Sequence, residues 1–231
     1  MLLHNLEFVV DSIVYHVTVP NSLATKSILH LIAVLSRDMR GELIRYYDKL
    51  LSAVLSLMDM KEPEKTSDVF QTLILMFRNL NGKDIYDNIA VIRKYYGPLF
   101  GSKTDFVRQF ACESYCYLLR HMRSTTKKSS SLDSSKSQTK EQVKDQIHEL
   151  IIVLKAVARK DSISDNMVLG ISSLLFESIR SLGNQARHYG IDIYKAFLEI
   201  VIGKKSLTKS STIPTSSFIS VWNELQYALA E

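Results

Sequence analysis

The chain of 231 residues has few of the residues that make sharp turns, with eight glycines and four prolines. An average globular chain carries about 7% glycine and about 5% proline, so this chain has less than half the usual amount. A fold of many short strands joined by tight turns is therefore excluded, and we expect an all-α protein. The length suits one or two ordinary domains with a sizeable core.

Cysteine is also scarce, since Cys112 and Cys116 are the two present. The sequence contains no Asn-x-Ser/Thr glycosylation signal and no recognisable secretory leader, so we expect a reducing intracellular compartment. The two cysteines are four residues apart on one expected helix and could be a redox pair or two ligands. A small buried cysteine is a common core residue, and the Cβ geometry of a disulfide fits this spacing poorly. We therefore predict two core cysteines.

Motifs for phosphate, metal and membrane binding are missing as well. No glycine-rich phosphate loop and no H-x-x-x-H pair occurs, and no apolar run approaches the roughly 20 residues of a membrane span. The sequence therefore predicts no cofactor, no metal site, no catalytic residues, no small-molecule substrate and no membrane partner, which is the profile of a protein that is not an enzyme.

Apolar residues recur at helical spacing along nearly the whole chain. The clearest stripe lies at 141–159, with Val143, Ile147, Leu150 and Leu154 on one face, and Thr139 with Gln142 fits a capping box before it. The same reasoning predicts about ten helices, at 2–17, 22–39, 41–58, 66–81, 83–99, 104–123, 141–159, 162–182, 185–202 and 217–230.

The expected helices form antiparallel pairs with a repeat of about 40 residues, once two Ser/Lys-rich segments are set aside. A period of 40 to 47 residues is typical of HEAT and armadillo repeats, so the fold class predicted is an α-α superhelix. Both terminal helices are apolar on several sides and lack the polar face of a cap, and we expect a piece of a longer solenoid. The predicted organisation is repeats at 1–123, a disordered insertion at 124–140, repeats at 141–202, a flexible linker at 203–217 and a terminal helix at 218–231.

The net charge of +5 gives an isoelectric point near 9.1, but the charge is unevenly distributed. Each Ser/Lys-rich segment carries +3, and residues 93–123 carry +4. Basic residues can contact RNA phosphates or an acidic partner. The candidates in the helices are Arg93, Lys94, Arg108, Arg120 and Arg123, and those in the flexible segments are Lys127, Lys128, Lys136, Lys204, Lys205 and Lys209.

Each candidate also has a structural alternative. Asp105, Val107, Arg108 and Ala111 fit the D-x-V-R-x-x-A start of many HEAT repeats, in which the arginine bridges consecutive repeats. The Ser/Lys-rich segments can be solvated insertions without a partner. In Tyr46-Tyr47 and Tyr95-Tyr96, which adjoin basic residues, we expect one tyrosine of each pair to pack inward.

Three blocks carry a family resemblance: VLSRDMRGELIRYYDKLLSAVLSLM at 34–58, FVRQFACESYCYLLRHM at 106–122, and LLFESIR at 174–180 followed by Gln185 and His188. Together they resemble the large HEAT-repeat scaffold of the small-subunit processome, also called the down-regulated-in-metastasis family, which is associated with U3 small nucleolar RNA. The resemblance covers about 25–202 and falls in the N-terminal part of the family pattern.

The resemblance implies a nucleolar scaffold for pre-rRNA processing and 40S biogenesis. Its implied partners are other processome proteins and, in addition, pre-rRNA or small nucleolar RNA. The alternative is a HEAT-repeat adaptor in nuclear transport or protein dephosphorylation, which binds peptides on its concave face. The residues by themselves, without the resemblance, predict an α-solenoid scaffold and no particular pathway.

Overall fold

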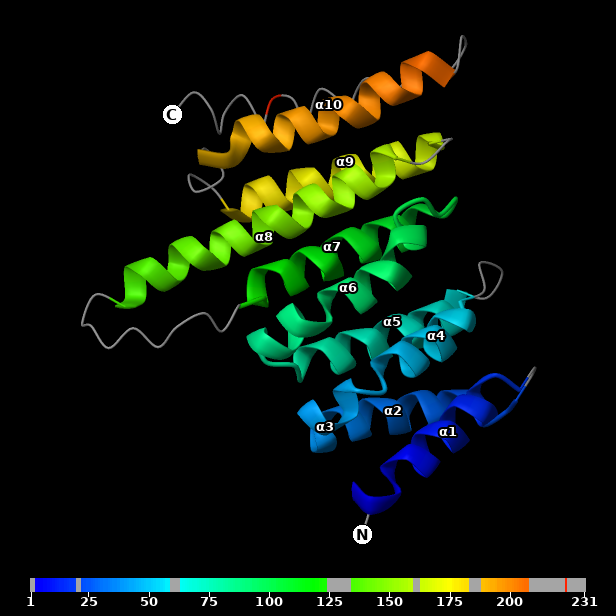
Figure 1. Ribbon diagram of the computed structural model, residues 1–231. Coiled ribbons are helices and arrows are strands. Elements are labelled where there is room, and N and C mark those ends of the chain that lie inside the picture. The colour runs from blue at the N-terminus through cyan, green and yellow to red at the C-terminus, as the bar shows by residue number, and fades with distance from the viewer. Residues whose placement is uncertain are drawn as a thin grey trace. The chain divides into compact units, whose positions relative to one another are not determined.

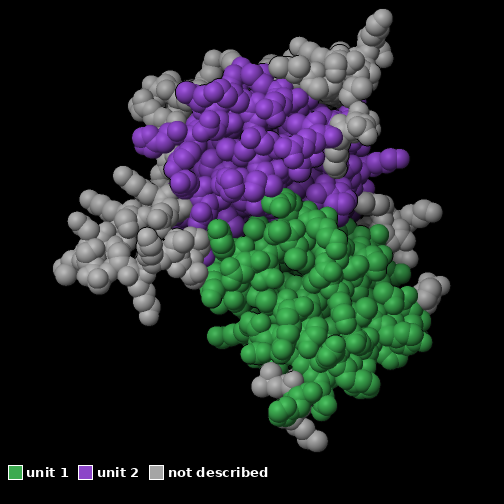
Figure 2. Space-filling model, in the orientation of Figure 1, with its two compact units in different colours: residues 1–95 green, residues 96–231 purple. Residues whose placement is uncertain are grey.

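The computed structural model forms two compact units, Met1–Tyr95 and Tyr96–Glu231 (Figure 2), and the division falls within one helix. The residues that it describes are 3–19, 22–58, 63–123, 134–159, 163–182, 188–207 and 223. These residues contain helices and no strand. The expected all-α class is confirmed.

The helices follow one another along the chain in the order expected (Figure 1). Unit 1 begins with a short 3-10 turn and contains α1 (Leu6–Val17), α2 (Thr25–Met39), α3 (Gly41–Ile44), α4 (Tyr47–Ser56), α5 (Pro63–Arg78) and most of α6 (Gly82–Leu99). Unit 2 contains α7 (Asp105–His121), α8 (Ser134–Ala158), α9 (Asp165–Leu182) and α10 (Gly190–Leu207).

In both units a helix packs beside the second helix after it in the chain, when α3 and α4 are counted as one. In unit 1, α2 packs on α5 and α1 packs on α4, and in unit 2, α7 packs on α9 and α8 packs on α10. Stacking the first helices of successive pairs on one another, and likewise the second helices, is the arrangement of an α-solenoid. The fold is therefore built from helix pairs as the period predicted.

Helix α7 shows why these sequences become helices with one buried face. Val107, Ala111 and Leu118 are spaced by four and seven residues and are fully buried. Each aliphatic side chain of this kind stabilises the fold by roughly 1.5 to 3 kcal/mol when it leaves water. Small Ala111 lies on this buried face, as its sequence position predicted.

Glycine at position 170 is required by the close approach of α9 to the end of α6. A Cβ at Gly170 would lie 1.9 Å from the carbonyl oxygen of Phe100. Phe100 is fully buried and forms an aromatic cluster with Tyr96 and Tyr115, with both of their ring centroids within 6.4 Å of its own. This cluster and the backbone contact fix the spacing of the helices in unit 2.

Several boundaries differ from those expected. The helix predicted at 41–58 is two helices, because α3 ends at Ile44 and α4 starts at Tyr47. Helix α8 begins at Ser134 rather than at 141, so 134–140 is helical and Thr139 is not its N-cap. The Lys and Gln residues of this segment are good helix formers, and an existing helix extends by one or two turns at little cost. For the same reason α10 continues to Leu207, inside the expected linker.

The N-terminal helix α1 buries one face and exposes two aromatic side chains on another. Leu6, Val10 and Ile13 are buried, whereas Phe8 is 75% exposed and Tyr15 is 68% exposed. Thr18 ends the helix with its hydroxyl donating to the carbonyl oxygen of Val14 at 3.1 Å, so the segment after Val17 is a helix exit. The terminal helix expected at 218–231 lies outside the described residues, apart from Asn223.

Candidate functional site

The predicted basic residues Arg93 and Lys94 lie on α6 in unit 1. Arg93 is half-buried, and Lys94 is exposed. The Lys94 ammonium donates to Asp48 Oδ1 at 3.0 Å and lies 4.9 Å from the ring centroid of Tyr95. The hydrogen bond between the two side chains raises the pKa of Lys94 and lowers the pKa of the Asp48 carboxyl. Lys94 is thus already paired with a carboxylate of α4.

Arg108, in unit 2, holds the start of α7 to its surroundings, and only 11% of its side chain is exposed. Its Nη1 donates to the carbonyl oxygens of Ser102 and Lys103, at 2.7 and 3.1 Å, and to Asn166 Oδ1 at 3.4 Å. Its Nη2 pairs with Asp105 at 2.8 Å. Because Asn166 belongs to α9, these contacts match the bridging role that the sequence left open, and they leave Arg108 poorly placed for RNA.

Arg120 and Arg123 are exposed at the far end of α7. The 12 residues between Arg108 and Arg120 correspond to about 18 Å along a helix at 1.5 Å per residue. The backbone carbonyl of Arg120 accepts a hydrogen bond from Gln142 Nε2 at 2.8 Å, and the residue is exposed. The structure therefore does not gather the candidates of unit 2 into one basic patch.

The structure does not describe the side chains of the candidate basic residues in the Ser/Lys-rich segments. Lys127, Lys128 and Lys209 lie outside the described residues, as do the side chains of Lys136, Lys204 and Lys205, although the backbones of these last three belong to α8 and α10. Their contact with RNA or an acidic partner stays a prediction.

Both cysteines are buried core residues without a disulfide, as predicted. The Cys112 thiol donates to the carbonyl oxygen of Gly170 at 3.1 Å, and burial raises its pKa to about 12. Burial also raises the pKa of the Cys116 thiol. Since the thiolate is the reactive form, neither cysteine is set up as a nucleophile.

The two tyrosine pairs confirm the prediction that one member packs inward. Tyr47 and Tyr96 are fully buried, and burial raises the pKa of both phenols. Their neighbours are partly exposed: Tyr46 directly precedes α4, and Tyr95 belongs to α6. The outer tyrosines pack against basic neighbours, with the Arg45 guanidinium 5.3 Å from the ring centroid of Tyr46.

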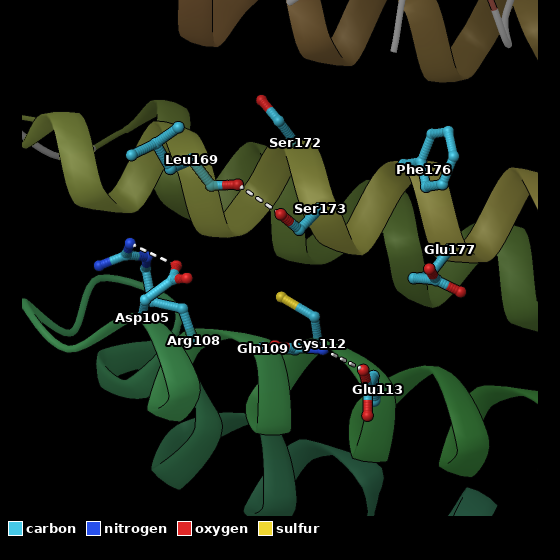
Figure 3. A pocket seen from close by; sticks show the side chains of 10 residues that line it. All are labelled: Asp105, Arg108, Gln109, Cys112, Glu113, Leu169, Ser172, Ser173, Phe176 and Glu177. Atoms are coloured by element: carbon cyan, nitrogen blue, oxygen red, sulfur yellow. Dashed lines mark hydrogen bonds and ion pairs between the residues drawn. The ribbon is translucent and has the colours of Figure 1, made fainter. Parts of the chain in front are cut away.

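The structure reveals a groove in unit 2 that the sequence did not predict, with a volume of about 420 Å³ (Figure 3). One wall is the side of α7 that faces α9, formed by Asp105, Arg108, Gln109, Cys112 and Glu113. The other wall is α9, formed by Leu169, Ser172, Ser173, Phe176 and Glu177. A groove of this size between two stacked helices is in the range of ligand-binding sites.

Matched polar rows line the groove. Gln109 and Glu113 are four residues apart on α7, where Gln109 Nε2 donates to Glu113 Oε1 at 2.8 Å. Ser173 and Glu177 have the same spacing on α9, and each lies 64 residues after its counterpart on α7. The equal spacing within the two polar pairs, and their common offset of 64 residues, is the sequence signal that could have predicted the groove. The Ser/Lys-rich insertion lies between the two pairs and lengthens the 40-residue repeat, so the signal is obscured.

The described part of the chain offers no other obvious chemistry. It contains no group of three or more His, Cys, Asp or Glu side chains that could hold a metal ion. No helix in the described ranges is both long and apolar enough to span a bilayer.

No family model matches the chain. Among solved structures it is similar to a designed armadillo repeat protein, at 14% sequence identity and a TM-score of 0.36. The match covers 95% of this chain and 98% of the designed protein. The solenoid assignment rests on the alternating helix contacts described above.

Proposed function

We propose that this protein is a non-enzymatic α-solenoid scaffold of the small-subunit processome, located in the nucleolus. It binds other assembly factors during pre-rRNA processing and 40S biogenesis, and contacts pre-rRNA or small nucleolar RNA through exposed arginines such as Arg120 and Arg123. The pathway is taken from the resemblance of 34–58, 106–122 and 174–180 to the processome scaffold family.

The observation that carries the scaffold role is the alternating packing of helices in each unit, α2 on α5 and α7 on α9. Stacked helix pairs present long rows of exposed side chains, which suit the binding of extended partners. The buried thiols of Cys112 and Cys116 and the paired guanidinium of Arg108 support a role without covalent chemistry.

Partner recovery tests the proposal. The protein is tagged in cells, crosslinked and purified. Its associated proteins are identified by mass spectrometry and its associated RNAs by sequencing. We expect processome proteins and pre-rRNA, enriched over a tagged helical-repeat protein of unrelated function. Recovery of transport receptors with their cargo, or of a phosphatase core, without processome components would replace the proposal with the adaptor alternative.

The adaptor alternative has one structural observation in its favour, which is the groove between α7 and α9. A groove lined by an amide, hydroxyls and carboxylates is suited to an extended peptide. Peptide binding is compatible with both pathways, and the partners recovered from cells decide between them.

A further inference from the structure

The groove between α7 and α9 has an uncompensated negative charge. Three carboxylates line it, those of Asp105, Glu113 and Glu177, and Arg108 is the one cation among its lining residues. The Arg108 guanidinium is already bonded to Asp105 and to two loop carbonyls. The charges of Glu113 and Glu177 therefore remain without a cationic partner within the groove.

These two carboxylates lie at the same end of the groove and come from opposite walls (Figure 3). Glu113 is exposed and accepts a hydrogen bond from the neutral amide of Gln109, which leaves its charge in place. Glu177 is half-buried on α9. Two like charges at one end of a cleft raise the local concentration of cations and repel phosphates. The groove thus favours a basic ligand and disfavours RNA.

The other lining groups suit a long basic side chain on an extended backbone. Phe176 and Leu169 provide apolar surface for the methylene stem of lysine or arginine, and an aromatic ring can also face the cation. The Gln109 amide donates to Glu113, and the Ser173 hydroxyl donates to the carbonyl of Leu169 at 3.1 Å. Their oxygens keep lone pairs that can accept hydrogen bonds from peptide N–H groups.

We infer that this groove binds an extended segment of a partner protein that carries lysine or arginine, with the cationic head group at Glu113 and Glu177 and its stem against Phe176. This inference rests on the proposed scaffold function, which makes the partner a protein, and it adds the chemistry of the segment that is bound.

Fluorescence anisotropy with the whole chain tests the inference. The probe is a labelled octapeptide that alternates lysine and serine, and the control probe has glutamate in place of lysine. The test variant is Glu113→Gln with Glu177→Gln, which keeps side-chain shape. The matched control is Glu64→Gln with Glu199→Gln, which makes the same change in net charge at exposed positions of α5 and α10.

We expect the lysine peptide to bind and the glutamate peptide not to bind. The groove variant should bind the lysine peptide about tenfold more weakly, since two partly desolvated charge pairs are lost, and the control variant should stay within about twofold of the original protein. Circular dichroism verifies that both variants are folded. Equal binding by the groove variant, or an equal loss in the control variant, would overturn the inference.

The same variants separate this inference from the proposed function. If the groove variant recovers processome proteins from cells as well as the original protein does and binds the peptide equally, the groove assignment fails and the scaffold stands. If peptide binding depends on Glu113 and Glu177 but transport or phosphatase partners are recovered, the processome assignment fails and the groove stands.

Discussion

The two units hold their helices together by different means. In unit 1, exposed ion pairs link neighbouring helices: Lys49 of α4 to Asp11 of α1 at 2.7 Å, and Lys94 of α6 to Asp48 of α4 at 3.0 Å. Unit 1 also has a buried hydrogen bond between neutral groups, from Tyr47 to the Met76 carbonyl, whereas in unit 2 a buried hydrogen bond ends on a carboxylate. The Tyr115 hydroxyl donates to Glu149 Oε1 on α8 at 2.7 Å, in a fully enclosed site.

The difference indicates which contacts fix the spacing between helices in this protein. A solvated ion pair is screened by salt and tolerates movement of its long side chains. A buried donor and acceptor must stay in register, because leaving either unsatisfied costs the full desolvation of the group. Unit 2, which also contains the groove, therefore depends more on buried contacts whose loss is costly, and unit 1 relies in addition on exposed ion pairs. Three comparisons sharpen this contrast.

The largest effect is expected for Gly170→Ala in unit 2. The new Cβ would meet the Phe100 carbonyl at 1.9 Å, and a backbone atom cannot move aside as a side chain can. Overpacking typically costs about 1 to 3 kcal/mol of unfolding free energy, and a clash with backbone is expected near the upper end of that range. Urea unfolding measures the loss, and hydrogen exchange should localise it to α7 and α9.

The matched control for Gly170→Ala is Gly97→Ala in α6, where no atom lies within 4 Å of the added Cβ. Alanine in a helix interior is better than glycine by about 0.5 to 1 kcal/mol, but Pro98 follows and disfavours a helical backbone at a residue with a Cβ, so this variant should unfold close to the original protein. If Gly170→Ala unfolded at the same urea concentration as Gly97→Ala, the tight spacing of unit 2 would be refuted.

An intermediate effect is expected when a buried tyrosine loses its hydroxyl. Tyr115→Phe removes the donor to Glu149 in unit 2, and Tyr47→Phe removes the donor to the Met76 carbonyl at 3.0 Å in unit 1. Hydrogen bonds to a charged group contribute about 1.5 to 3 kcal/mol, and those between neutral groups about 1 kcal/mol.

The tyrosine variants are compared by urea unfolding, and Tyr115→Phe should lose more stability than Tyr47→Phe. Tyr117→Phe, at a half-exposed position on α7, is the control and should unfold like the original protein. The reverse order of the two buried variants would show that the contrast between the units is wrong.

The smallest effect is expected for Lys94→Gln in unit 1. The hydrogen bond from Lys94 lowers the pKa of Asp48 in the folded state. A depressed carboxyl pKa contributes stability above the unfolded-state value, near pH 4, and that contribution is lost as the pH falls through the folded-state value. Lys94→Gln should therefore remove a small part of the stability at neutral pH and reduce its fall in acid.

Thermal unfolding measured from neutral to acid pH, at low and high salt, tests this expectation. Lys83→Gln, at an exposed position on the same helix, is the control. A difference between the two variants that persisted in high salt would contradict the description of the Lys94 pair as solvent-screened.

The helices and their buried faces could be predicted because they follow from local spacing. Val107, Ala111 and Leu118 are buried as the stripe in α7 required. The break between α3 and α4 could not be predicted, since apolar residues continue at helical spacing through Leu43 and Tyr47, and both are buried. The earlier boundary between α2 and α3, which the sequence did predict, lies at Arg40, a residue with a φ of 42°.

The groove could not be predicted for a different reason. Glu113 and Glu177 come together only because α7 packs on α9, and helix pairing across a long insertion is not a local property. Arg108 illustrates the same limit. Its spacing from Asp105 was informative, but its partners in the preceding loop and at Asn166 are set by tertiary packing.

Alternating helix packing also sets an order of events during synthesis of the chain. Helix α2 can meet α5 after 23 intervening residues, whereas α7 meets α9 only after 43. Chain synthesis proceeds at about 5 to 20 residues per second. The face of α7 that carries Cys112 therefore remains unpacked on the order of seconds longer than the corresponding face of α2. The second unit is thus the later to mature on a translating ribosome, and its apolar face is the one that nascent-chain chaperones would meet.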